Sequence, residues 1–186
     1  MNKKTLFFLI ILLSFQSLRT YCTNYYVNDN STTGDTYCTA VGNDANSGLT
    51  KALPKLTLKT IPVFDLNAGD TVFIDAGTYT SANDYFILGA DDQGSAAGYI
   101  VFKGASISKT IIGRTSSTNP RCFDLSSNIY IKIQDLTLQS SSSGAENIRT
   151  SGNSDYIYIY TIVILQAQLL QMALVLIWQI PPIIVK

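Results

Sequence analysis

The clearest pattern in the sequence is a short alternation of apolar and polar positions between two turns. Residues 69–79 read Gly-Asp-Thr-Val-Phe-Ile-Asp-Ala-Gly-Thr-Tyr, with a Gly-Asp turn before the alternating run and an Ala-Gly turn after it. Alternation with a period of two between turn residues is typical of a β-strand with one buried face. Similar runs occur at residues 99–104, 128–133 and 155–160, so a chain built from repeated strands is predicted.

The spacing of these runs predicts stacked strands. Aligning their apolar positions gives offsets of 28, 29 and 26 residues for the pairs Val72/Ile100, Ile100/Ile129 and Ile131/Ile157. Shorter β-rich pieces at residues 110–112 and 136–138 fit as second strands of the same repeat. A repeat made of strands and polar turns, with no helix, is what one coil of a β-solenoid requires. The competing fold is an antiparallel sandwich, but the joins are too long and irregular for most of its hairpin turns.

One short helix is predicted, at the N-terminal end of this β-structure. In residues 52–61 the apolar side chains have roughly helical spacing, Pro54 suits a first turn and Pro62 ends the segment. A helix at this place would cap the open edge of the strands and protect it from pairing with other chains.

Composition excludes several classes of function. The 186 residues make one domain, the charged residues balance to zero, and no basic excess argues for nucleic acid. The sequence contains no His, the commonest general base. A Ser-His-Asp triad, a Cys-His protease and a zinc hydrolase are therefore excluded for this chain acting alone.

The N-terminal segment predicts export. Residues 1–22 have a charged start and an apolar run at residues 6–13, which is too short for the roughly 20 residues that span a bilayer. This pattern is typical of a secretory signal peptide, so a secreted or cell-surface protein beginning near Thr23 is expected. Cys38 and Cys122 are then the remaining cysteines; they either form a disulfide or are two buried thiols.

Candidate metal ligands are few. Residues 29–34 partly imitate a calcium loop, but Ala40 occupies the place of the bidentate Glu, and simple turn chemistry is the alternative. The pair Asp91-Asp92 lies in a Gly-rich loop that suits a turn. No metal site and no cofactor are predicted for the chain as given.

Three segments together support a resemblance to a known family. Residues 25–28 (Tyr-Tyr-Val-Asn), the loop at 42–48 and the strand at 69–79 resemble the N-terminal part of right-handed parallel β-helix proteins of the pectate-lyase-like superfamily. The resemblance covers roughly residues 25–160. It implies an exported all-β protein, a right-handed parallel β-helix with a capping helix, in a superfamily of polysaccharide lyases, glycoside hydrolases and surface proteins. Its lyases generally hold calcium, so Ca²⁺ is an expectation for an intact protein; no catalytic residue matches.

The coil alignment also predicts which side chains point outward. It places Asp75, Lys103, Lys132 and Tyr158 in one outward column and Val101, Tyr130 and Tyr156 in the next. Lysines beside exposed tyrosines could bind an acidic sugar chain. The candidate ligand-binding residues are therefore Lys103, Lys132, Tyr130, Tyr156 and Tyr158. The alternative is an ordinary solvated face.

The composition changes abruptly after Tyr160. Residues 161–186 contain no Gly, Asn, Asp or Ser and are mostly aliphatic. Read with the codons displaced by two bases, the segment can encode a Ser/Thr/Asn/Gly-rich sequence like the rest of the chain. A frameshift therefore explains residues 161–186 as an aberrant tail. The alternative is a membrane anchor, against which four Gln and the pair Pro181-Pro182 argue.

Two classes of function follow for the domain at residues 23–160. One is the truncated N-terminal fragment of an exported β-helix protein whose intact form binds or degrades polysaccharide. The other is a non-catalytic cell-surface or adhesive β-helix, with residues 161–186 as its anchor. Too few coils are present for catalysis by the chain as given.

Overall fold

A computed structural model describes residues 22–114, 121–140 and 146–166. Within these ranges the chain is mostly β, and all strand-to-strand pairings are parallel. The strands are β1 (Asn24–Val27), β2 (Thr71–Ile74), β3 (Gly77–Tyr79), β4 (Phe86–Ile87), β5 (Ile100–Gly104), β6 (Thr110–Arg114), β7 (Arg121–Ser126), β8 (Ile129–Ser140), β9 (Glu146–Ser151) and β10 (Asp155–Gln166). Two 3₁₀ turns, η1 (Leu58–Thr60) and η2 (Pro62–Phe64), follow the N-terminal loops.

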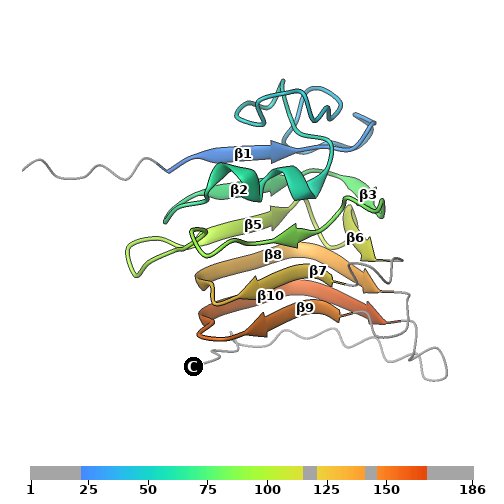
Figure 1. The fold of residues 1–186 in the computed structure, drawn as a ribbon. Coiled ribbons are helices and arrows are strands. Elements are labelled where there is room, and N and C mark those ends of the chain that lie inside the picture. Colours follow the sequence, from blue (N-terminus) through green and yellow to red (C-terminus); the bar gives the residue numbers. More distant parts are fainter. Residues whose placement is uncertain (1–21, 115–120, 141–145, 167–186) are drawn as a thin grey trace, which may run out of the picture.

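The strands form two sheets. The first has the order β1-β2-β5-β8-β6-β3, with β10 also paired to β8; the second has the order β4-β7-β9. Strand β8 is long enough to pair with β5 through its first half and with β6 through its second half. The chain thus crosses the first sheet, returns through the second and begins again one level further on. Figure 1 shows these levels, with β7 and β9 running opposite to β8 and β10.

Two of the three predicted offsets are wrong by two residues. Val72 lies beside Phe102, an offset of 30, and Ile100 lies beside Ile131, an offset of 31. The third pair, Ile131 and Ile157, is confirmed at 26 residues. A slip of two residues keeps every side chain on the same face of a strand, so the alternation alone does not detect it. The second strands predicted at residues 110–112 and 136–138 are confirmed, as β6 and the second half of β8.

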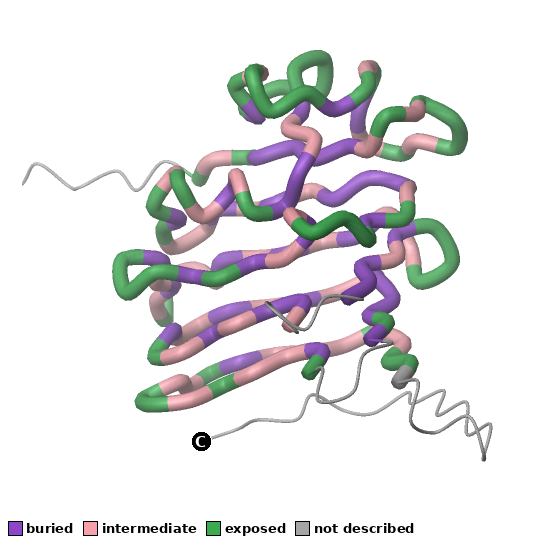
Figure 2. The backbone as a smooth tube through the Cα atoms, turned by 45° about the vertical axis from the view of Figure 1, so that its right-hand side comes forward, coloured by how far each residue is buried: buried purple, intermediate pink, exposed green. Residues whose placement is uncertain are grey.

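The core lies between the two sheets, where the buried residues of each level stack on those of the next (Figure 2). Its centre is an aromatic cluster. The Phe86 ring centroid lies 4.8 Å from that of Phe123 and 4.7 Å from that of Phe102. All three side chains are fully buried. Phe102 therefore lies beside Val72 where it also joins two rings of the second sheet, which helps to fix the register.

The exposed edge of β1 is covered by extended backbone and not by a helix. The Tyr26 N–H donates to the Gly48 carbonyl (2.7 Å), and the Lys55 N–H donates to the Tyr26 carbonyl (2.9 Å). The helix predicted at residues 52–61 is therefore wrong; only η1 forms there. Because Lys55 pairs with β1 and the Asp44 carboxylate accepts from the Leu56 and Thr57 N–H groups, this segment is held extended.

The disulfide proposed between Cys38 and Cys122 is not formed. Both thiols are free and buried. The Cys38 thiol contacts the Val27 carbonyl in β1, whereas the Cys122 thiol contacts the Ile112 carbonyl in β6. Two levels of strands, each about 4.8 Å thick, separate these contacts, which exceeds the reach of a disulfide.

The compositional change after Tyr160 does not interrupt the fold. Strand β10 continues to Gln166, with Ile162 beside Leu136 and Ile164 beside Leu138. The predicted signal peptide lies outside the described residues, apart from Cys22, and so does the tail beyond Gln166. Among the helices of the described ranges, none has the length and apolarity needed to cross a membrane.

Candidate functional site

The outer face of β5, β8 and β10 carries a cluster of tyrosines around one lysine. We call it the tyrosine face, and its residues are Tyr99, Tyr130, Lys132, Tyr156, Tyr158 and Tyr160. They gather because the strands are parallel and in register, so outward side chains of successive levels lie above one another. Three of the predicted ligand-binding tyrosines, Tyr130, Tyr156 and Tyr158, belong to it.

Tyr130 and Tyr156 form a stacked pair. Their ring centroids are 4.3 Å apart and the ring planes differ by 7°. Both residues have left-handed backbone angles, with φ of 54° and 55°. Such a conformation costs a non-glycine residue roughly 1–2 kcal/mol, so the shared backbone geometry is held by the surrounding levels. Tyr156 is 38% exposed and presents the more accessible ring of the pair.

Tyr99 and Lys132 connect this pair to the other rings. The Tyr99 ring meets Tyr130 at 5.4 Å and Tyr158 at 5.2 Å, in both cases edge to face. The Lys132 ammonium lies 5.1 Å from the centroid of Tyr99 and 5.8 Å from that of Tyr160. A cation over aromatic rings is attracted by their negative faces. Lys132 is therefore held at the centre of the cluster.

The tyrosine hydroxyls are neutral hydrogen-bonding groups at physiological pH. Burial and, to a smaller extent, the Asp135 carboxylate raise the pKa of Tyr160, whose hydroxyl donates to the Gln134 side chain. Burial also raises the pKa of Tyr99, with a further contribution from Tyr158. The face thus offers phenolic O–H groups, ring surfaces and one ammonium group, which is suitable chemistry for binding a polar ligand.

The predicted single column of Asp75, Lys103, Lys132 and Tyr158 is wrong. Lys103 lies between Phe73 and Gln134, whereas Lys132 lies between Val101 and Tyr158. The two-residue slip in register separates the lysines into neighbouring columns. Val101 likewise belongs to the column of Lys132 and not to that of Tyr130.

Asp75 is not on the outer face at all. Its side chain is fully buried, and its carboxylate accepts hydrogen bonds from the N–H groups of Thr36 (2.7 Å), Tyr37 (2.9 Å) and Cys38. Strand β2 ends at Ile74 and the chain turns there, so the alternation that predicted an outward Asp75 has already stopped. Asp75 anchors the N-terminal loop.

The rings continue toward the N-terminal end beside Lys103. Phe73 stacks on Tyr26 with centroids 5.4 Å apart and also contacts Tyr37 at 4.8 Å. The sequence analysis missed Phe73, Tyr99 and Tyr160 as members of an aromatic surface. Their outward parity with Lys103 and Tyr158 in the printed sequence was the signal that could have found them.

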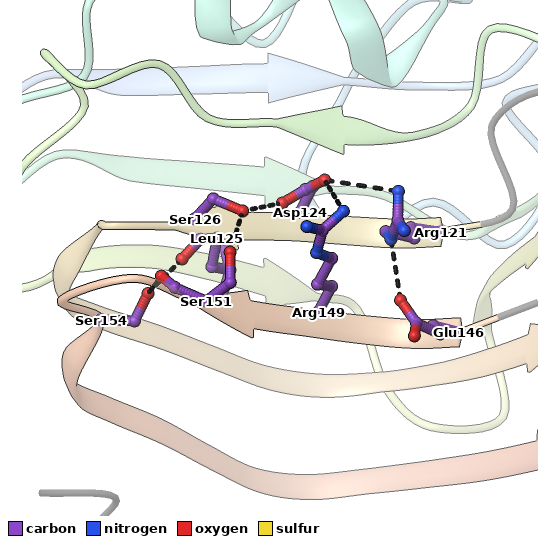
Figure 3. Close-up of polar contacts among 8 residues, drawn as sticks. All are labelled: Arg121, Asp124, Leu125, Ser126, Glu146, Arg149, Ser151 and Ser154. Atoms are coloured by element: carbon purple, nitrogen blue, oxygen red, sulfur yellow. Dashed lines mark hydrogen bonds and ion pairs between the residues drawn. The ribbon is translucent and has the colours of Figure 1, made fainter.

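The second sheet carries a polar ladder on β7 and β9 (Figure 3). Arg121 Nε lies 2.8 Å from the Glu146 carboxylate, and Asp124 lies 3.6 Å from Arg121 and 3.8 Å from Arg149. Ser126 and Ser151 continue the ladder through a 2.7 Å hydrogen bond. Two arginines and two carboxylates pair with one another, so cross-strand stabilisation accounts for this cluster.

The calcium-like loop is occupied by turn hydrogen bonds. Asp29 Oδ1 accepts from the Ser31 N–H (2.7 Å), and the Asn28 amide donates to Asp35 (2.7 Å). These are the short-range side-chain contacts expected of a turn. Within the described ranges, no three His, Cys, Asp or Glu side chains are grouped so as to hold a metal ion.

Comparison with known proteins gives no family assignment. No protein-family profile matches this sequence, and no curated protein matches it. The site is therefore interpreted from its own residues.

Proposed function

We propose that the described residues are the first coils of a right-handed parallel β-helix of the pectate-lyase-like kind. Three columns of parallel strands support this fold: β1-β2-β5 with the first halves of β8 and β10, β3-β6 with their second halves, and β4-β7-β9. The level repeat of 26 to 31 residues also suits a solenoid coil. Right-handedness is the expected hand for parallel strands joined by crossovers.

We propose further that this β-helix is exported and binds polysaccharide through the tyrosine face. The observation that carries the proposal is the gathering of five tyrosines around Lys132 on one outer face. Aromatic rings offer flat apolar surfaces to the C–H faces of sugars, while phenolic hydroxyls bond to sugar hydroxyls. Lys132, with Lys103 in the neighbouring column, adds positive charge for an acidic sugar chain.

The stacked pair decides how a sugar would contact the face. Because Tyr130 and Tyr156 cover one face of each other's rings, they present ring edges, hydroxyls and the outer face of Tyr156. A sugar chain would therefore contact the rings of successive levels in turn, with its hydroxyls toward the phenolic O–H groups. This arrangement differs from the row of open flat rings that the sequence suggested.

Binding can be measured by affinity electrophoresis and calorimetry with polygalacturonate as an acidic chain and a neutral glucan beside it. Tyr156→Ala should weaken binding about three- to tenfold, the scale of one aromatic contact. Lys132→Met should weaken binding of the acidic chain and reduce its dependence on salt. Lys51→Met, at an exposed lysine in the N-terminal loops, serves as the matched control and should change nothing. Equal affinities for all four proteins would refute the tyrosine face as the binding site.

The second candidate is a non-catalytic surface or adhesive protein. It is favoured by the shortage of grouped carboxylates, since no three acidic side chains in the described part of the chain come together. A depolymerising enzyme predicts new reducing or unsaturated sugar ends on incubation with polysaccharide. The adhesive candidate predicts binding without such ends.

The frameshift remains our hypothesis for the change in composition after Tyr160, and with it the view that the chain is a truncated fragment. It is tested by resequencing the locus. An uninterrupted frame with a stop codon after Lys186, and no β-helix coding beyond it, would leave the membrane anchor as the explanation of the apolar tail.

A further inference from the structure

Strand β10 presents an unpaired edge at one end of the stack. In the described part of the chain it pairs only with β8, although it is twelve residues long. Between Asp155 and Gln166 it contains no charge, no Pro and no Gly. Natural edge strands are usually protected by charges, prolines or a covering segment. Figure 2 shows intermediate and exposed positions along this end.

The interior side chains of this level are incompletely covered. Ile148, Ile159 and Ile162 pack against the core but are only partly buried, and Ile164 is 54% exposed. Their neighbours one level up are core residues: Ile133 lies beside Ile159, Leu136 beside Ile162 and Leu138 beside Ile164. The end of the stack is thus an open cross-section of the core, with backbone groups of β10 around it.

A second copy of this chain can meet this edge only with its own β10. The other edge of the first sheet, on β1, already pairs through Tyr26 with Gly48 and Lys55. Stacking one copy's β1 on another copy's β10 would require that pairing to break. The remaining arrangement is a two-fold pair in which β10 meets β10 and the strands run antiparallel.

The sequence of β10 is complementary to itself in that arrangement. The left-handed residue Thr161 (φ 51°) lies at the midpoint of Asp155–Gln166, with six residues at 155–160 and six at 161–166. A two-fold axis at this corner pairs residues whose numbers add to 321. The interior side chains then meet interior ones, Ile157 with Ile164 and Ile159 with Ile162.

The outward side chains and the single charge also match. Tyr158 meets Val163 and Tyr156 meets Leu165, all on the outer side of the strand. Asp155 comes opposite Gln166, far from the Asp155 of the other copy. A parallel, in-register pair would instead place the two Asp155 carboxylates side by side, which is unfavourable.

We propose that two copies of this chain associate through their β10 strands, antiparallel about the Tyr160–Thr161 corner, and so join their open core ends into one continuous core. This inference does not depend on polysaccharide binding. It assigns β10 as an isologous interface and predicts a dimer that does not grow into a fibre, because each copy has one such edge.

The association is tested on the purified full chain by sedimentation and light scattering over a range of concentrations. The expected mass is twice that of the protomer. Ile164→Lys places two charges in the paired strands and should shift the protein to the protomer mass, with its circular dichroism unchanged. Val63→Lys, at a 78% exposed residue of η2, is the matched control and should stay dimeric.

Cross-linking tests the register even where Ile164→Lys lowers stability. In a Cys22→Ser background, Tyr158→Cys with Val163→Cys should give a disulfide-linked dimer on oxidation. Within one strand these positions are about 16 Å apart, too far to bridge. Tyr158→Cys alone should not cross-link. A protomer mass at all concentrations, as when residues beyond Gln166 or another segment cover the edge, would overturn the proposal. Open-ended oligomers, or absence of the cross-link, would do the same.

Discussion

At the scale of single residues, the two buried thiols give a direct test of the interior. Burial raises the pKa of Cys122 to about 12, although Arg114 acts in the opposite direction. Burial and the Asp75 carboxylate raise the pKa of Cys38 further still. Both groups are then protonated thiols at pH 8, and the thiolate is the reactive form. We expect alkylation of native protein at pH 8 to spare both cysteines and to modify them only after unfolding. The exposed Cys22, where present, is the internal control, and fast labelling of Cys122 would contradict the buried geometry.

Gly104 is the residue at which the corner between two strands is tightest. A Cβ atom there would lie 2.2 Å from the Asp135 carbonyl oxygen, in the next level, so Gly104→Ala requires the backbone to move. We expect it to lower the free energy of unfolding by about 1–3 kcal/mol, the usual cost of overpacking. Gly89→Ala is the matched control, because its nearest neighbour, an Asp92 oxygen, would be 3.6 Å away. Urea denaturation of both variants measures the difference, and equal stability would show that the corner is looser than described.

At the scale of elements, the aromatic cluster joins the two sheets. Phe123 on β7 contacts Phe86 from the level before and Phe102 on β5. Phe123→Ala leaves a cavity at the centre of the core and should cost about 3–5 kcal/mol. Phe123→Leu keeps most of the volume and should cost clearly less. Denaturation midpoints report both, and a similar small loss for the two variants would place Phe123 outside the core.

The same scale shows what sequence pattern can and cannot predict. The strands of the first sheet were predictable because their alternation is strong, as in Ile129–Ile133, which lies in β8. The second sheet was missed, because β7 and β9 carry Arg, Asp, Asn and Ser among few apolar residues. Register was wrong by two residues because such a slip preserves the faces. The helix at residues 52–61 was wrong because pairing of Lys55 with β1 outweighs helical spacing.

The candidate site was predictable to the same degree. Outward parity, which depends only on alternation, correctly placed Tyr130, Tyr156 and Tyr158 on one face. Columns depend on register, so the grouping of Lys103 with Lys132 was wrong. Asp75 was misplaced because the end of a strand is a tertiary feature, decided here by the three N–H groups that its carboxylate binds.

At the scale of the whole molecule, the two ends of the stack differ. One end is covered by the loops that pair with β1, and Asp75 ties these loops to β2 through the N–H groups of residues 36–38. Asp75→Ala removes the acceptor and leaves these buried donors unpaired, at a cost of about 1–3 kcal/mol for each that water does not reach. Because the same loops cover the β1 edge, we expect faster amide exchange at residues 36–38 and at Tyr26, followed by association through the newly open edge. Asp91→Ala, at an exposed turn residue, is the matched control for the loss of one carboxylate. Hydrogen exchange resolves the two ends. If Asp75→Ala accelerated exchange uniformly through β5 and β8 instead, the loops would be part of one cooperative unit with the stack and not a separable cap.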